Sequence, residues 1–488
     1  MRRNQPHSPW RLARDQRWSI LCIIAFSVAL TGCVTPKEIA PIRDPTSYET
    51  KESFAVPTKD WPSDRWWTGF GDTQLDNLIE EGLENAPSLQ IAAARFAHAE
   101  ALVGEARSRL LPSIDASSQI GGQKSSYNYL IPKATVTANS RERPAEWDDY
   151  AQGSMGISWE LDFWGRNRSA LATARSVAEA SRAEAAQVRL ELSTGIAAAY
   201  AGLAALYAEA DAADNAVSVR TQTFHLMDQR YHQALENVSA VERAKSALAA
   251  AQAEQKRLSE EIDLNHNRLA ALLGAGPDRG REIIRPSGIL SRPFGLPEHL
   301  PANLIGRRPD IVAARSRAGA AASQVKVAKA DFYPNIDLIG LIGVESLGVS
   351  NLFRSGSGYG LGGAAISLPI FTGGRLESQY RASEADYKEA VSEYNDVLTE
   401  ALREVADVLA SQRALVDRLQ YSRDSERSAT DAWGVANDRY KGGLATYLDV
   451  LTAEDALIAA RRTVAVLSAR AFSLDVALIR ALGGGYRS

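Results

Sequence analysis

The sequence predicts a mainly α-helical fold with a small β part, built from two copies of one unit. Two stretches of 67 residues without a proline, Arg166–His232 and Arg375–Lys441, predict two very long helices. Each follows a run in which apolar and polar residues alternate, which is typical of β-strands. Similar segments also recur about 210 to 220 residues apart, which indicates a duplicated supersecondary unit.

The spacing of the matching segments locates an insertion. The matches are 95–112 (RFAHAEALVGEARSRLLP) with 317–334 (RAGAAASQVKVAKADFYP), 159–169 (WELDFWGRNRS) with 368–378 (LPIFTGGRLES), and the Arg-Tyr pairs at 230 and 439. The first match has an offset of 222 and the other two have an offset of 209. An insertion of 13 residues in the first copy therefore lies between Pro112 and Gly165, and we expect it to enlarge a loop within residues 121–149.

The N-terminus has the features of an export signal. Five arginines precede an apolar run, Ile20–Leu30, that is too short to span a membrane as a helix. The run ends in Leu30-Thr31-Gly32-Cys33, which is similar to a bacterial lipobox. We therefore expect residues 1–32 to be a lipoprotein signal peptide and Cys33 to carry a covalent lipid anchor. An ordinary export signal with a chance cysteine is the alternative.

Composition excludes several classes of protein. Cys22 and Cys33 are the two cysteines of the chain, so the mature protein cannot build a disulfide framework or a zinc site of cysteines. Without residues 1–32, 50 basic residues face 58 acidic ones, and a net charge of −8 argues against nucleic-acid binding. No later segment has 18 consecutive apolar residues, so any part embedded in a membrane is expected to be a β-barrel.

The elements of the first copy follow in order. Residues 33–72 are rich in proline and aromatic residues and are expected to form an extended N-terminal strap. The first repeat is expected over residues 73–273, beginning with a helix from Thr73 to Leu110 with an N-terminal signal at Asp72. Pro112 ends that helix, and a β-hairpin, the long helix and a return helix complete the repeat.

The predicted strands have two different faces. Between Tyr150 and Phe163, odd-numbered positions such as Met155 and Trp159 are apolar, whereas even-numbered positions such as Gln152 and Ser154 are polar. This is the pattern of a strand with one lipid face and one wet face, although a soluble hairpin gives a similar pattern. Alternation is weaker in the second copy, at 336–344 and 364–370.

The long helices have a coiled-coil pattern and end in short turns. Apolar residues follow a 3-4 spacing, which predicts left-handed packing, at Val391, Tyr394, Leu398, Ala401, Val405, Val408, Leu415 and Leu419. The turns are predicted at Gln233–Val238 and Gly442–Thr446. An irregular equatorial connector is expected over 274–306, the second repeat over 307–482 and a C-terminal tail over 483–488.

With these elements in place, the chain resembles the outer membrane factor family, the TolC-like channels, in its lipoprotein branch that serves RND-type multidrug efflux pumps. The resemblance runs from about Trp66 to Leu482 and is carried by Trp66-Trp67, WELDFWGR at 159–166, Arg307-Arg308-Pro309-Asp310, LPIFTGGR at 368–375 and RYKGGLATYLDVLTA at 439–453. It implies a homotrimer in which each subunit gives four strands to a 12-stranded transmembrane β-barrel. A long periplasmic α-helical coiled-coil barrel, with an equatorial region, continues it.

The resemblance also implies roles for the junctions between strands and helices. Gly165, Arg166, Gly374 and Arg375 would sit where the barrel becomes the tunnel. Glycine there would allow a sharp change of direction, and arginine would face the polar interface of the membrane. A solvated helix start is an equally good interpretation of the two arginines.

In this family the helix tips close the tunnel and receive a periplasmic adaptor. Tyr440 and Asp449 match the gate tyrosine and the first acidic position of the family. Ala445, Thr452 and Ala240 replace polar residues of the TolC pattern, so the sequence does not identify which residues hold the gate closed. Asp449 could instead be a helix N-terminal acid favoured by the helix dipole. The expected adaptor-docking residues are Ala234, Leu235, Gly442, Gly443 and Leu444.

The resemblance implies a passive exit duct in the outer membrane of a Gram-negative bacterium. An inner-membrane RND transporter would deliver solutes through a periplasmic adaptor. No catalytic, metal or cofactor site is expected, apart from the covalent lipid. Ducts for type I protein secretion or heavy-metal efflux, a periplasmic adaptor lipoprotein and an enzyme are the alternatives. His225 and His232, seven residues apart on one helix face, could form a metal pair, but surface histidines near a helix tip are the favoured explanation.

Overall fold

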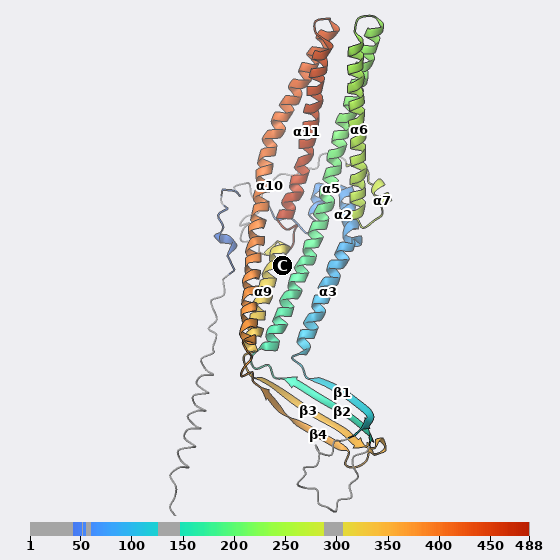
Figure 1. Ribbon diagram of the computed structural model, residues 1–488. Helices are drawn as coiled ribbons and strands as arrows, with labels where there is room; N and C mark the ends of the chain where they lie inside the picture. Colours follow the sequence, from blue (N-terminus) through green and yellow to red (C-terminus); the bar gives the residue numbers. More distant parts are fainter. Residues whose placement is uncertain (1–41, 51, 55–59, 125–146, 287–305, 488) are drawn as a thin grey trace, which may run out of the picture.

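The computed structural model describes residues 42–50, 52–54, 60–124, 147–286 and 306–487. The molecule is elongated, with a small sheet at one end and two helical hairpins that extend to the other end (Figure 1). The C-terminal end of the chain lies beside α9, near the middle of the long axis of the molecule (Figure 1). The predicted division into a mainly helical fold with a small β part is confirmed.

The elements follow one another in the predicted order. The helices are η1 (Pro45–Ser47), η2 (Trp66–Phe70), α2 (Thr73–Asn85), α3 (Pro87–Ser108), α5 (Arg166–His232), α6 (Val238–Leu272), α7 (Pro277–Arg281), α9 (Pro309–Ala330), η5 (Val349–Asn351), α10 (Arg375–Lys441) and α11 (Tyr447–Ala481). The strands are β1 (Ser113–Gln123), β2 (Asp148–Glu160), β3 (Asn335–Leu347) and β4 (Gly358–Ser367).

The duplication is exact at the level of helix boundaries. Helices α3 and α9 both have 22 residues and begin 222 positions apart. Helices α5 and α10 both have 67 residues, and α6 and α11 both have 35, with an offset of 209 in each case. The two predicted long helices are therefore confirmed with their predicted bounds.

The expected single helix from Thr73 to Leu110 is wrong, because the chain breaks at Ala86. Ala86 has an extended backbone with ψ of 126°, and Pro87 then begins α3. A residue that precedes proline avoids the helical region for steric reasons, and proline is well suited to the first turn of a new helix. The N-terminal signal at Asp72 is confirmed, since its Oδ1 accepts hydrogen bonds from the amides of Gln74 and Leu75.

The four strands form one antiparallel sheet in the order β1-β2-β3-β4. Ser113 lies opposite Ser158 in the first hairpin, and Asn335 lies opposite Ser367 in the second, so the pairing preserves both offsets. The equivalent distal pairs, Gln123–Asp148 and Glu345–Ser357, enclose residues 124–147 and 346–356. The insertion therefore belongs to the first enclosed segment, most of which lies outside the described residues.

The core lies near mid-length and follows the predicted apolar positions. One cluster joins η2, α2, α5 and α11 around Trp67, Ile196, Tyr200 and Phe472. A second cluster lies along α10, where seven of the eight predicted coiled-coil positions are buried and Leu419 is partly buried. Although one window of α5 is apolar enough to cross a membrane, 56% of it is buried against the rest of the protein, as in a core helix.

The strap packs against the second copy, and the C-terminal segment packs against the strap. Tyr48, Phe54 and Trp61 pack against the cluster on α10. After α11 the chain passes through three consecutive glycines with positive φ, and a Cβ at Gly485 would lie 2.3 Å from the carbonyl carbon of Ser63. The close approach of these two segments therefore requires glycine.

Candidate functional site

The helix tips are closed by two capped turns. Helix α5 ends at His232, and α6 begins after Asn237, whose side chain accepts a hydrogen bond from the amide of Ala240 at 3.1 Å. The second tip runs from Lys441 to Thr446. Thr446 and Asp449 form a capping box at the start of α11. Both turns therefore orient their helices by local hydrogen bonds.

The five residues predicted to dock an adaptor lie in these two turns. Leu235 and Leu444 are exposed apolar side chains at equivalent positions, 59% and 73% accessible. Ala234 and Gly443, also equivalent, both have positive φ, at 57° and 71°. Together with Gly442, they form an exposed end of the molecule, and their role in docking stays a prediction.

Tyr440 is buried where the two tips meet. Its hydroxyl lies 3.2 Å from Oε1 of Glu236 and 3.3 Å from Sδ of Met227. The guanidinium of Arg230 lies 4.9 Å from the centre of its ring. Burial first, and then the Glu236 carboxylate, raise the pKa of Tyr440 to about 12, so its hydroxyl is a hydrogen-bond donor at neutral pH.

Glu236 is the residue that sequence reasoning missed at the tip. Ala240 stands where the TolC pattern has an acid, and Glu236 lies four residues earlier in the same tip. Its carboxylate nevertheless reaches Tyr440 on the other hairpin. The available signal in the sequence was an acidic residue four positions before Ala240. Only the path of the turn shows that the Glu236 carboxylate lies within hydrogen-bond distance of the Tyr440 hydroxyl.

Asp449 has a local role that the structure shows directly. Its Oδ2 accepts hydrogen bonds from the amide and the hydroxyl of Thr446, both at 2.8 Å. These bonds lower the pKa of the Asp449 carboxyl. The alternative interpretation, a helix N-terminal acid, is therefore correct for its local contacts, and a further role in a gate stays a prediction. Thr452 bonds back to the carbonyl of Leu448.

A buried ionic cluster joins the two hairpins further from the tip. Arg220 of α5 pairs with Glu454 of α11 at 3.2 Å and also bonds to Asp455. Arg220 and Glu454 are almost fully buried, and the hydroxyl of Thr223 lies 3.4 Å from Glu454. Burial raises the pKa of Glu454, while Arg220 opposes this effect. The cluster fixes α5 against α11, because loss of Arg220 would leave the buried Glu454 carboxylate without its counter-charge.

The junction glycines have the conformation that the sequence suggested. Gly165 and Gly374 both have left-handed backbones, with φ of 78° and 85°, directly before α5 and α10. Arg166 is exposed and pairs with Asp331 at 2.7 Å, whereas Arg375 is exposed and donates to Gln379 at 3.0 Å. These contacts also fit a solvated helix start, so an interfacial role for the two arginines stays a prediction.

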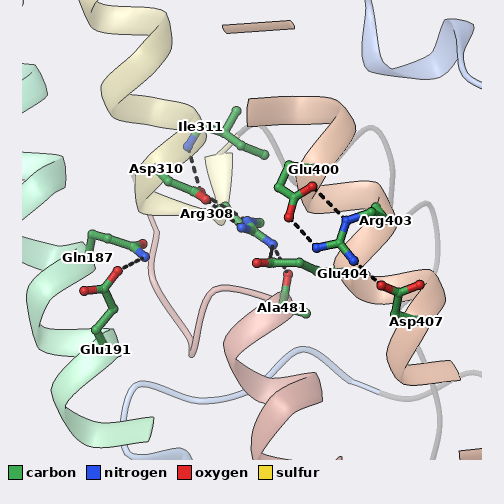
Figure 2. A network of polar contacts seen from close by, with 10 residues as sticks. All are labelled: Gln187, Glu191, Arg308, Asp310, Ile311, Glu400, Arg403, Glu404, Asp407 and Ala481. Carbon is green, nitrogen blue, oxygen red and sulfur yellow. Dashed lines mark hydrogen bonds and ion pairs between the residues drawn. The ribbon is translucent and has the colours of Figure 1, made fainter. Parts of the chain in front are cut away.

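Arg308 and Asp310 of the Arg307-Arg308-Pro309-Asp310 motif lie in the polar network that Figure 2 shows. Arg308 donates to both oxygens of Asp310, to Glu404 of α10 at 2.8 Å and to the carbonyl of Ala481 at 3.0 Å. Burial opposes its charge, but the two carboxylates outweigh that effect and raise the pKa of Arg308. The start of α9, the middle of α10 and the end of α11 are thereby joined.

Among the described residues, no group of three or more His, Cys, Asp and Glu side chains is placed to hold a metal ion. His232 lies 3.7 Å from Asp228 of its own helix, and His225 is exposed. The predicted lipidation site Cys33 and the signal peptide lie outside the described residues.

Comparison with known proteins gives one consistent family. The model of the outer membrane efflux protein family matches residues 78–275 and 300–484. The fusaric acid resistance protein FusA of Burkholderia cepacia is 33% identical over 375 residues, which cover 75% of this chain and 69% of FusA. The multidrug resistance outer membrane protein MdtP of Escherichia coli K12 is 28% identical over 484 residues, covering 96% of this chain and 97% of MdtP.

Solved structures agree with the sequence relatives. The outer membrane protein VceC of Vibrio cholerae superposes with a TM-score of 0.81 at 42% identity, covering 88% of this chain and all of VceC. The outer-membrane channel OprN gives a TM-score of 0.80 at 26% identity, covering 92% of this chain and 98% of OprN. The arrangement of sheet, long helices and tips is therefore that of known outer-membrane channels.

Proposed function

Because the chain belongs to the outer membrane efflux protein family, we propose that it is the exit duct of a tripartite efflux system in the outer membrane. It conducts solutes passively and supplies no chemistry of its own. The relatives are named for multidrug and fusaric acid resistance, which favours small toxic organic compounds as the solutes. No observation on this chain favours protein secretion, metal efflux or an adaptor role over this function.

The observation that carries the proposal is the incomplete surroundings of the second copy. Helix α5 packs against four long helices, namely α3, α6, α9 and α11. Among the described elements, α10 packs chiefly against α9 and α11. The duplication relates α9 and α11, the further neighbours of α5, to α3 and α6. Helix α10 therefore lacks neighbours of these two kinds, and α3 and α6 of a partner subunit would supply them. A ring of identical subunits closes this heterologous contact.

Exposed apolar residues lie where those contacts are missing. Val435 on α10 and Ile91 on α3 are exposed, whereas each has an equivalent that packs in the interior. Those equivalents are Leu226 and Ala313, respectively. The same surface is thus covered inside the subunit and open at its flanks, which is the expected pattern when identical subunits continue the repeat.

The sheet has the same incompleteness. Strands β1 and β4 are its two edges and have unpaired long sides. Applying both offsets to the β2–β3 register, in which Ser158 lies opposite Ile339, places Ser367 opposite Ser117 of the partner subunit. Three subunits of four strands then form the proposed 12-stranded barrel.

The remaining parts of the proposal concern the anchor and the partners. Cys33 carries the covalent lipid, and the exposed turns at Leu235 and Leu444 dock a periplasmic adaptor that an RND transporter feeds. The net negative charge of the mature chain gives the duct a weak preference for cations.

The test is the mass of the purified, lipidated protein in detergent together with its single-channel conductance in planar bilayers. We expect a trimer with small, cation-preferring openings. A disulfide in the S117C/S367C variant should link the subunits, whereas the S118C/S367C control, shifted by one residue, should link far less, because the side chains then face opposite sides of the sheet. A monomer that never conducts would overturn the proposal.

A further inference from the structure

A cavity of about 240 Å³ lies between α5, α6 and α11, at a level between the tips and the network of Arg308. Six of the residues that line it are alanines, three on α5 and three on α6. They are Ala212, Ala213, Ala216, Ala247, Ala250 and Ala251. Their spacing of three and four places them on the facing sides of the two helices. The space remains open because methyl groups stand where larger apolar side chains usually fill a coiled-coil seam.

The second hairpin does not repeat the alanines of α5. The α10 positions equivalent to these three alanines are occupied by Tyr421, Ser422 and Ser425. The arginine at the end of this face has also changed, since Ala429 is the equivalent of Arg220. A hairpin with the same helix lengths therefore packs without this lining, and the cavity belongs to the first copy rather than to the repeat in general.

The charged residues that line the cavity are paired with one another. Arg462 of α11 lies 3.2 Å from Glu209 of α5 and 3.0 Å from Glu254 of α6. Arg220 of α5 is paired with two carboxylates of α11. A charged ligand would have to break one of these ion pairs or enter without a counter-charge, and both cost free energy at a partly buried site. The cavity therefore suits an uncharged molecule.

Arg220 has one donor to spare at the cavity wall. Its side chain is 5% exposed, its Nε lies 3.2 Å from Glu454 and its Nη2 donates to Asp455. Its Nη1 is buried, and no acceptor among the described residues forms a hydrogen bond with it. A buried donor without an acceptor carries the cost of its lost hydration, and an acceptor on a ligand would remove that cost. A hydroxyl or carbonyl oxygen on the ligand is therefore favoured.

The volume sets the size of the ligand. A dry cavity of roughly 150 Å³ holds benzene, so 240 Å³ accommodates about ten non-hydrogen atoms. We propose that this cavity binds an uncharged, mostly apolar organic molecule of the size of two fused rings, whose polar group accepts a hydrogen bond from Arg220. The alanine methyl groups contact the rings, and the ion pairs of Arg462 stay intact beside them. The site goes beyond the proposed function, because binding there requires neither conduction nor an adaptor.

The first test is protection of a single cysteine from alkylation, with 2-naphthol as the probe. Ala250 lines the cavity, whereas Ala249 is an exposed neighbour outside the lining. Apart from Cys33, the chain without residues 1–32 has no cysteine, and the proposed lipid occupies that sulfur. At a probe concentration about ten times its Kd, alkylation of A250C should slow about tenfold and that of A249C less than about twofold. Equal protection at both positions, or none at A250C, would overturn the proposal.

The second test measures the affinity for 2-naphthol by equilibrium dialysis of the purified, lipidated protein, with detergent alone as the blank. A216L fills part of the cavity and should weaken binding by about tenfold or more, whereas A249L should change it less than about twofold. R220K keeps a positive charge beside Glu454 but removes Nη1, and it should weaken binding about tenfold. If A216L does not fold, protection of A250C decides the size argument.

The charge of the probe is the last variable. The anion 2-naphthoate and the cation 2-naphthylmethylammonium should both bind about tenfold more weakly than 2-naphthol, because each lacks a free counter-charge in the cavity. The proposal is wrong if a charged probe binds as tightly as 2-naphthol, or if a folded A216L variant binds 2-naphthol as tightly as the wild type. A trimer that binds 2-naphthol but never conducts would overturn the proposed function alone.

Discussion

The two copies of the repeat have the same helix lengths, but they are joined to the equator by different interactions. In the first copy, Tyr200 donates to Asp72 at 2.9 Å and accepts from Gln74 at 3.0 Å within an apolar cluster. In the second copy, the equivalent of Tyr200 is Leu409, and the ionic network of Arg308 joins the helices instead.

The difference between the copies shows which features duplication preserves. Helix boundaries and strand register are set by glycine, proline and apolar spacing, which both copies keep. Side-chain contacts depend on single positions, and these have diverged: Arg308 is equivalent to Ala86, and Glu404 is equivalent to Gly195.

Loss of Arg308 should have the largest effect. R308A removes the shared partner of Asp310 and Glu404, and we expect it to destabilise the protein by about 3 kcal/mol, toward the low end for a broken buried pair because both carboxylates are partly exposed. Chemical denaturation in detergent measures the change. R281A, at an exposed position, should change stability by less than about 0.5 kcal/mol; equal losses would refute a special role for Arg308.

Loss of the Tyr200 hydroxyl should have an intermediate effect that is confined to the first copy. Y200F keeps the buried ring but removes the bonds to Asp72 and Gln74, and we expect a loss of about 1–2 kcal/mol in the same denaturation experiment. Burial raises the pKa of Tyr200, so in the native protein its hydroxyl is protonated at the neutral pH of the denaturation experiment. Y421F, on an exposed tyrosine of α10, is the control, and a similar loss there would contradict the assignment.

Swapping alanine and glycine at the two tip turns should change the stability of the tips in opposite directions. Ala234 is the one non-glycine residue with positive φ in the described part of the chain, and Gly443 is its equivalent. A234G should relieve backbone strain and stabilise the first tip, whereas G443A should destabilise the second, each by about 0.5–1 kcal/mol. Hydrogen exchange of the tip amides measures both, and a shift of the same sign in both variants would exclude backbone strain as the cause.

Alkaline pH should loosen the tip with no effect near neutrality. Burial is the main cause that raises the pKa values of Tyr440 and Tyr447 to about 12, above their ordinary value of 10. A raised folded-state pKa gives stability that is complete below pH 10 and is lost as the pH rises from 10 toward 12. The thermal stability of the protein should therefore fall in that range, and less so in Y440F. A thermal stability that is independent of pH up to 12 would count against burial of these hydroxyls at the tip.

The fold could be predicted from the sequence because its signals are long and repeated. Both 67-residue helices were predicted with their exact bounds, since each follows a glycine and contains no proline, which leaves few alternatives. The break at Ala86 was missed because a single proline in an alanine-rich helical pattern is a weaker signal than a change of period. Asp449 was correctly associated with the tip, but its capping bonds to Thr446 required the backbone geometry.

The duplication, the order and length of the elements and the glycine junctions at Gly165 and Gly374 could therefore be predicted without a structure. All of these depend on local backbone preferences or on spacing along the chain. By contrast, the contact of Glu236 with Tyr440, the contact of Arg220 with Glu454 and the joining of three helices by Arg308 follow from how the helices pack. These partners are separated by 96 to 234 residues in the chain, and no local pattern specifies which side chains meet when long helices pack.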